Sequence, residues 1–70
     1  MKLLDVVALI EDVPEHGLRR GQVGTIVETW DEGVFEVEFA DTDGITYAFA
    51  ALRAEQLMVL QWQPDASPSA

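Results

Sequence analysis

The 70-residue sequence contains no cysteine, one histidine and four lysine and arginine residues against thirteen acidic residues. Without cysteine the chain can form neither disulfides nor thiolate metal sites, and it suits a reducing compartment. The formal charge of −9 repels nucleic acid phosphates and anionic membrane surfaces. We therefore expect no binding to nucleic acid or membranes, and a basic protein is the better-matched partner.

Long hydrophobic runs are also missing. The opening MKLLDVVALIED resembles a signal peptide only superficially, because Asp5 interrupts the apolar stretch and further acids follow it. No run approaches the roughly 20 apolar residues of a membrane-spanning helix. The sequence therefore predicts a cytoplasmic protein, and its length predicts one small domain.

The usual components of an active site are scarce. The only serines are Ser67 and Ser69, His16 has no visible catalytic companion, and neither a metal-ligand cluster nor a glycine-rich phosphate loop is present. The segment from Asp41 to Gly44 resembles the start of a calcium loop, but turn formation explains its aspartates better. We expect a protein that is not an enzyme and that uses no cofactor and no metal.

Short β-branched and alternating segments indicate an all-β fold. A long, proline-containing loop follows the first of them, and a helical or 3-10 turn over 52–56 precedes the last. This pattern predicts a small five-stranded SH3-like barrel over residues 1–62, followed by a disordered C-terminal tail over residues 63–70. The predicted strands are residues 5–10, 23–30, 34–40, 45–50 and 57–61.

The segment LRRGQVGTIVE, residues 18–28, places two glycines around the start of the second strand. We expect Gly21 to adopt a positive φ at the end of the loop. Gly24 removes a side chain either where the curled sheet bends or where another strand approaches closely. The pattern resembles the second strand of several small SH3-like barrels, among them KOW-type modules and small photosynthetic reaction-centre and reductase subunits.

A closer resemblance extends from Leu4 to about Leu60. The words DVVALIEDVPEHGLRRGQVGTIVE, FEVEFAD and LRAEQLMVL resemble a family of small acidic bacterial proteins of unknown function. The resemblance brings no established activity. It implies that such proteins are often encoded beside another small protein, as immunity or antitoxin partners are.

Two turns with glycine after an acid flank the alternating strand VFEVEFA: Asp31-Glu32-Gly33 and Thr42-Asp43-Gly44. Each fits a three-residue hairpin loop with a positive φ at Gly33 and Gly44. Regular strands would then pair Val37 with both Val27 and Phe49. The core face predicted from this register comprises Val27, Phe35, Val37, Phe39, Tyr47 and Phe49.

The opposite face of the hairpins is the predicted binding site. Glu28 would lie opposite Glu36, and such a like-charge pair destabilises a sheet. An acidic, partly apolar face suits a basic partner. The alternative is that the glutamates are ordinary solvated groups and that Trp30 covers the hairpin end as part of the core. The predicted face comprises Ile26, Glu28, Trp30, Val34, Glu36, Glu38, Thr46, Ala48 and Ala50.

Arg19 and Arg20 form the only basic cluster, and they complete the candidate binding residues. They could bind a carboxylate or phosphate, or they could offset nearby acids and hold the long loop against the barrel, which we favour. The sequence thus predicts a non-catalytic module that binds a basic protein. The most specific form of this prediction is an immunity or antitoxin role. The alternative is an accessory subunit of an enzyme or electron-transfer complex.

Overall fold

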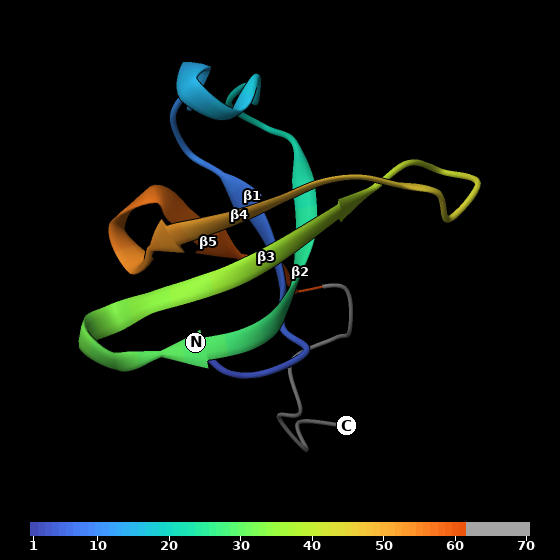
Figure 1. The fold of residues 1–70 in the computed structure, drawn as a ribbon. Helices are drawn as coiled ribbons and strands as arrows, with labels where there is room; N and C mark the ends of the chain where they lie inside the picture. Colours follow the sequence, from blue (N-terminus) through green and yellow to red (C-terminus); the bar gives the residue numbers. More distant parts are fainter. Residues whose placement is uncertain (62–70) are drawn as a thin grey trace, which may run out of the picture.

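A computed structural model describes residues 1–61 of the chain, and over this range the protein is all-β, as predicted (Figure 1). Its strands are β1 (Val6–Leu9), β2 (Val23–Trp30), β3 (Val34–Ala40), β4 (Thr46–Arg53) and β5 (Leu57–Val59). Three short 3-10 turns connect them: η1 (Pro14–His16), η2 (Asp31–Gly33) and η3 (Ala54–Gln56). The tail predicted to be disordered, residues 63–70, and Trp62 lie outside the described residues.

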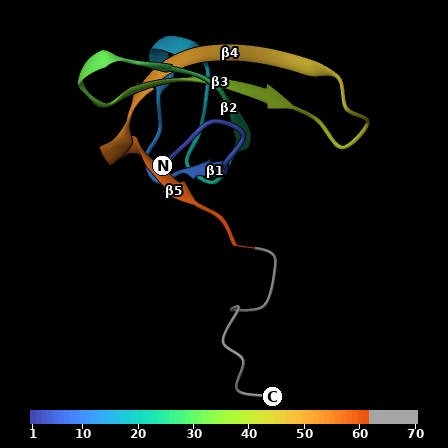
Figure 2. The same cartoon turned by 90° about the horizontal axis from the view of Figure 1, so that it is seen from below.

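The five strands form one antiparallel sheet in the order β4-β3-β2-β1-β5. This order, with a 3-10 turn between the last two strands, fits the predicted small barrel. Figure 2 shows β3 and β4 lying over β1 and β5, so the sheet curls back on itself. Among the described residues, β4 pairs only with β3 and β5 only with β1, and both are therefore edge strands.

The hydrophobic core lies inside this curl. Val7, Ile26, Val37 and Phe39 are completely buried. The first loop contributes too, because the Val13 N–H donates to the Leu18 carbonyl at 2.9 Å and the loop folds back on itself. The other buried apolar residues of the cluster are Leu9, Val13, Leu18, Ala50, Leu52 and Leu57.

Gly24 occupies a buried position on β2 between Val7 of β1 and Phe39 of β3. A Cβ atom at this position would lie 2.6 Å from Val37 Cγ1 and 2.8 Å from the backbone oxygen of Glu38. Real Cβ atoms do not approach other atoms so closely. The glycine is therefore present because β3 approaches closely, which is the second of the two explanations considered from the sequence.

The predicted turn conformations are confirmed. Gly21 has a φ of +92°, Gly33 of +73° and Gly44 of +80°. The neighbouring Glu32 also adopts a positive φ, of +64°, which a residue with a side chain adopts only at a cost. The two acid-glycine turns thus reverse the chain where the sequence places them.

The predicted register of the β2–β3 hairpin is right near its turn and wrong beyond it. Glu28 pairs with Glu36, as predicted. A β-bulge at Val27 then shifts the register, so that Val37 pairs with Ile26 rather than with Val27. Ile26 is completely buried, and its prediction as a residue of the solvent-facing binding site is therefore wrong.

A second bulge, at Tyr47, changes the faces of β4. Val37 pairs with Ala50 instead of Phe49. Ala50 is consequently buried, whereas Phe49 is 57% and Tyr47 48% exposed, opposite to the prediction for all three. A bulge adds one residue to one strand, and every side chain beyond it moves to the other face of the sheet.

Candidate functional site

The solvent side of strands β2, β3 and β4 carries three cross-strand rows of side chains. We call this set of residues the outer face. Its three carboxylates, Glu28, Glu36 and Glu38, lie between two aromatic residues, Trp30 and Phe49, at diagonally opposite corners. Its rows are Thr25–Glu38–Phe49, Glu28–Glu36–Ala51 and Trp30–Val34–Arg53.

The central carboxylates of the outer face are held by neutral donors. The indole N–H of Trp30 donates to Glu36 Oε1 at 3.3 Å, and the Thr46 hydroxyl donates to Glu38 Oε2. Within the described part of the chain, the exposed Glu28 accepts one hydrogen bond, from the backbone N–H of Thr29 at 3.3 Å. Among residues 1–61, none of these three glutamates forms an ion pair. Their negative charges are therefore positioned but not neutralised.

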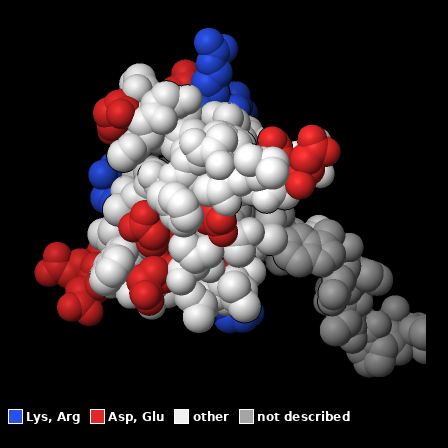
Figure 3. Space-filling view, turned by 45° about the vertical axis from the view of Figure 1, so that its right-hand side comes forward, with Lys and Arg blue, Asp and Glu red and all other residues white. Residues whose placement is uncertain are grey.

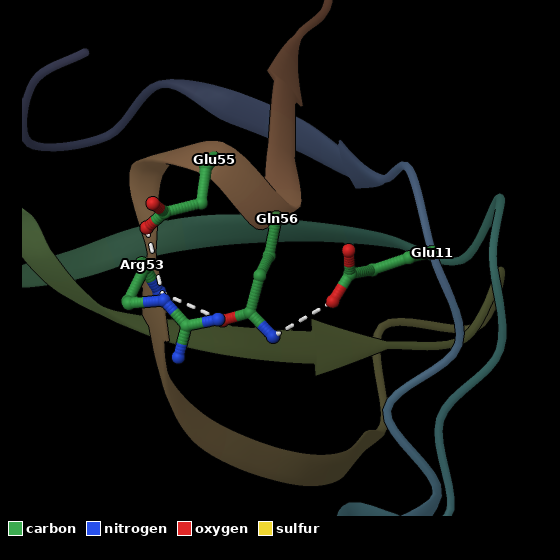
Figure 4. Close-up of polar contacts among 4 residues, drawn as sticks. All are labelled: Glu11, Arg53, Glu55 and Gln56. Atoms are coloured by element: carbon green, nitrogen blue, oxygen red, sulfur yellow. Dashed lines mark hydrogen bonds and ion pairs between the residues drawn. The ribbon is translucent and has the colours of Figure 1, made fainter.

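Arg53 is the cation of the outer face, and it is already paired. Its Nε lies 2.9 Å from Glu55 Oε1 (Figure 4). Figure 3 shows acidic groups distributed over the visible surface with uncharged area between them, and basic groups at the margins. The outer face thus carries an excess of negative charge.

The two aromatic corners are substantially exposed. Trp30 is 54% and Phe49 57% exposed, so Trp30 does not close over the core as the alternative interpretation required. Aromatic faces attract lysine and arginine cations, and carboxylates form charge-assisted hydrogen bonds with them. The outer face therefore combines the two kinds of group that recognise basic side chains.

Phe49 is the functional candidate that the sequence analysis missed. The predicted fourth strand ends at Ala50, whereas β4 continues to Arg53. Side chains alternate between the two faces of a strand, so the buried Leu52 lies on the same face as Ala50 and on the opposite face from Phe49. In a regular strand that extends to Leu52, a core-facing Phe49 would place Leu52 in solvent. This conflict between two large apolar residues indicates a bulge in the strand.

Arg19 and Arg20 lie in the first loop and are not part of the outer face. Their backbone groups anchor the loop, since the Arg20 N–H donates to Asp12 Oδ1 at 2.8 Å and the Arg19 N–H donates to Gln22 Oε1. The loop is thus held by hydrogen bonds from the backbone. Among residues 1–61, the two guanidinium groups form no ion pairs with the nearby acids that they were predicted to offset.

Within residues 1–61, no three histidine or acidic side chains gather in a way that could hold a metal ion. Asp41 Oδ1 instead accepts the N–H groups of Asp43 and Ile45, at 2.9 and 3.0 Å. The aspartate therefore closes the β3–β4 turn, as the sequence analysis expected. No helical segment of this described region has the length and apolar character needed to cross a membrane.

Comparison with known proteins places the chain in a family. Neither the curated proteins nor the solved structures contain a significant match. A family profile, described as a domain of unknown function (DUF4926), matches residues 3–59. This range spans all five strands and more than half of the chain. The protein therefore belongs to the DUF4926 family.

Proposed function

We propose that this domain is a non-catalytic protein-binding module that docks a basic protein on its outer face. One observation carries the proposal. Glu28, Glu36 and Glu38 have no cationic partner among the described residues, and they lie between the exposed Trp30 and Phe49. Lysine and arginine side chains of a partner can contact both the carboxylates and the aromatic rings.

The arrangement of the carboxylates supports binding. The hydrogen bonds from Trp30 and Thr46 hold Glu36 and Glu38 on a rigid sheet, which reduces the entropy lost when a partner binds. The formal charge of −9 speeds the encounter with a basic protein. At physiological salt this long-range attraction is screened beyond about 8 Å, so the outer-face glutamates contribute most after contact.

The cross-strand pair of Glu28 and Glu36 supports the same conclusion. Like charges placed directly opposite each other in a sheet destabilise it by a fraction of a kcal/mol to about 1 kcal/mol. A cation from a partner removes this repulsion on binding. The unfavourable pair in the isolated domain thus becomes a favourable site in the complex.

An immunity or antitoxin role is the most specific form of this proposal. The small size and strong acidity of the chain support it, together with the resemblance to proteins encoded beside another small protein. In this role the outer face would neutralise a basic partner in the cytoplasm. An accessory subunit of a larger complex would use the same face, and the identity of the bound partner distinguishes the two.

The test is affinity capture with the full chain as bait from a lysate of the source cell. The wild type is compared with Glu36→Gln and with Glu15→Gln, which removes the same charge from the exposed η1 turn. We expect the wild type and Glu15→Gln to retain the same basic protein, and Glu36→Gln to release it at lower salt. Identical elution from all three baits, or retention of no basic protein, would refute the proposal.

A further inference from the structure

We infer that the free edge of β4 is a strand-addition site for an extended, lysine- or arginine-rich segment of the basic partner, an inference that rests on the proposed function. Strand β4 hydrogen bonds to β3 on one side only. Among the described residues, the backbone of its other edge has one hydrogen-bonding partner, the side chain of Gln56, which accepts the Arg53 N–H. The rest of this edge is open for pairing.

The contact between Arg53 and Gln56 shows which backbone groups point to the free edge. The Arg53 N–H donates to Gln56 Oε1 at 2.9 Å (Figure 4) and is therefore turned away from β3. Alternate residues of an antiparallel strand direct their N–H and C=O groups to the same side. The backbone groups of Ala51 and Phe49 consequently face the free edge as well. These are the same residues whose side chains belong to the outer face.

The free edge of β4 lacks the usual protection against pairing. Edge strands are commonly short, charged or interrupted by proline. The other edge strand, β5, has three residues, whereas β4 has eight and reads TYAFAALR. Its first charged residue is Arg53, and its bulge at Tyr47 leaves the following residues regular. A stretch of uncharged backbone from Ala48 to Leu52 thus remains available.

The outer face determines what kind of strand fits this edge. An added strand would lie about 5 Å from β4 and about 10 Å from β3. Ala51 is small and stands between that strand and Glu36, so a long basic side chain can pass over it toward the carboxylate. The position two residues along the added strand lies beside the exposed Phe49 ring, which attracts a cation. A segment with basic residues at alternate positions meets both groups.

A second copy of this chain is a poorer occupant of the same edge. Pairing two β4 edges would place two outer faces side by side, each with Glu36 and Glu38 and each on a molecule of formal charge −9. Like charges so close together oppose association. The charge complementarity therefore selects a basic segment from another protein.

The test is an NMR titration of the ¹⁵N-labelled full chain with an end-blocked peptide of alternating lysine and valine. Its matched controls are two forms of the same peptide, one with N-methyl groups on the lysine amides and one with N-methyl groups on the valine amides. Both preserve charge and side chains, and each blocks strand pairing along only one edge of the peptide, because alternate residues direct their N–H groups to the same side. We expect the unmodified peptide to slow hydrogen exchange at the Phe49 and Ala51 amides. We expect the form whose methyl groups face β4 to bind about tenfold more weakly than the form whose methyl groups point away, because strand addition depends on main-chain hydrogen bonds.

The variant Ala51→Pro provides a second test. Proline removes an N–H that faces the free edge and leaves the β3 ladder intact, as edge strands tolerate. We expect the variant to remain folded and to lose the slowed exchange at Phe49. Glu36→Gln should bind the peptide more weakly but keep the protection of both amides.

The outcomes separate this inference from the proposed function. Equal binding by the two N-methylated forms, together with undiminished peptide binding by Ala51→Pro, would overturn strand addition and leave docking of a basic partner standing. Equal affinity for a peptide of alternating glutamate and valine would overturn the preference for a basic partner. Absence of peptide binding, or a peptide-independent dimer in sedimentation with protected Phe49 and Ala51 amides, would overturn strand addition.

Discussion

Replacing Gly24 with alanine tests the close packing of β2 against β3. The new methyl group would lie 2.6 Å from Val37 Cγ1, 2.8 Å from the Glu38 carbonyl oxygen and 3.1 Å from Phe39 Cδ1. Val37 and Phe39 are completely buried and cannot rotate away into solvent. The Glu38 oxygen belongs to the backbone of β3. Relief therefore requires the two strands to separate.

The expected cost follows from these contacts. Overpacking a well-filled core costs about 1–3 kcal/mol, and the backbone contact places Gly24→Ala near the upper end. The lower conformational entropy of unfolded alanine offsets this by about 0.5–1 kcal/mol. We expect a net loss of about 2 kcal/mol. A chain of this length has a total stability of only about 4–10 kcal/mol, so the effect is large.

Urea unfolding followed by tryptophan fluorescence measures this loss. With a slope of about 1 kcal/mol per molar urea, a loss of about 2 kcal/mol lowers the midpoint by about 2 M. Gly17→Ala is the matched control, because its φ is +68° and nothing lies within 4 Å of the new methyl group. The control should lose only about 1 kcal/mol, from the left-handed backbone.

A midpoint for Gly24→Ala within about 0.5 M of the wild type, equivalent to about 0.5 kcal/mol, would refute this reasoning. It would mean that β2 and β3 are not in close contact at this position. An effect no larger than that of Gly17→Ala would also contradict it, because the close contacts at Gly24, whose φ is not positive, would then cost no more than the left-handed backbone costs at Gly17.

Three further predictions concern polar and strained positions. Gln56 is buried, accepts the Arg53 N–H and donates to Glu11 Oε2 at 3.3 Å. We expect Gln56→Glu to lower the free energy of unfolding by about 1–2 kcal/mol in urea unfolding, and the added Glu11→Gln to restore it. Failure of this rescue would show that the hydrogen bond between Gln56 and Glu11 is unimportant. Glu28→Gln and Glu36→Gln should each leave thermal stability unchanged or raise it by up to about 1 kcal/mol, since a like-charge pair is relieved, and strong destabilisation would argue that the glutamates serve the fold instead of binding. Glu32→Asn should raise the melting temperature by relieving the positive φ at this position, worth up to about 1 kcal/mol, and a decrease would contradict that reason.

Local signals in the sequence determined the strands and turns around the centre of the chain. The bounds of β2 and β3 match the prediction to the residue, because glycine turns and strict alternation are both encoded within a few neighbouring positions. The positive φ at Gly33 and Gly44 follows from the same local chemistry. The excess of acidic residues likewise depends on composition alone.

The tertiary structure alone decided which side chains face the solvent. Tyr47 bulges out of the β3 ladder. The centre of its ring lies 6.3 Å from that of Phe39, and its hydroxyl accepts a hydrogen bond from the Gln22 side chain at 3.2 Å. Phe39 lies across the β3–β4 hairpin, and Gln22 belongs to the first loop, 25 residues away in sequence. Side chains alternate with a period of two, so one extra residue in a strand reverses every position beyond it. Phe49 is exposed on the outer face for this reason, and the alternation within the predicted strand of residues 45–50 does not reveal it.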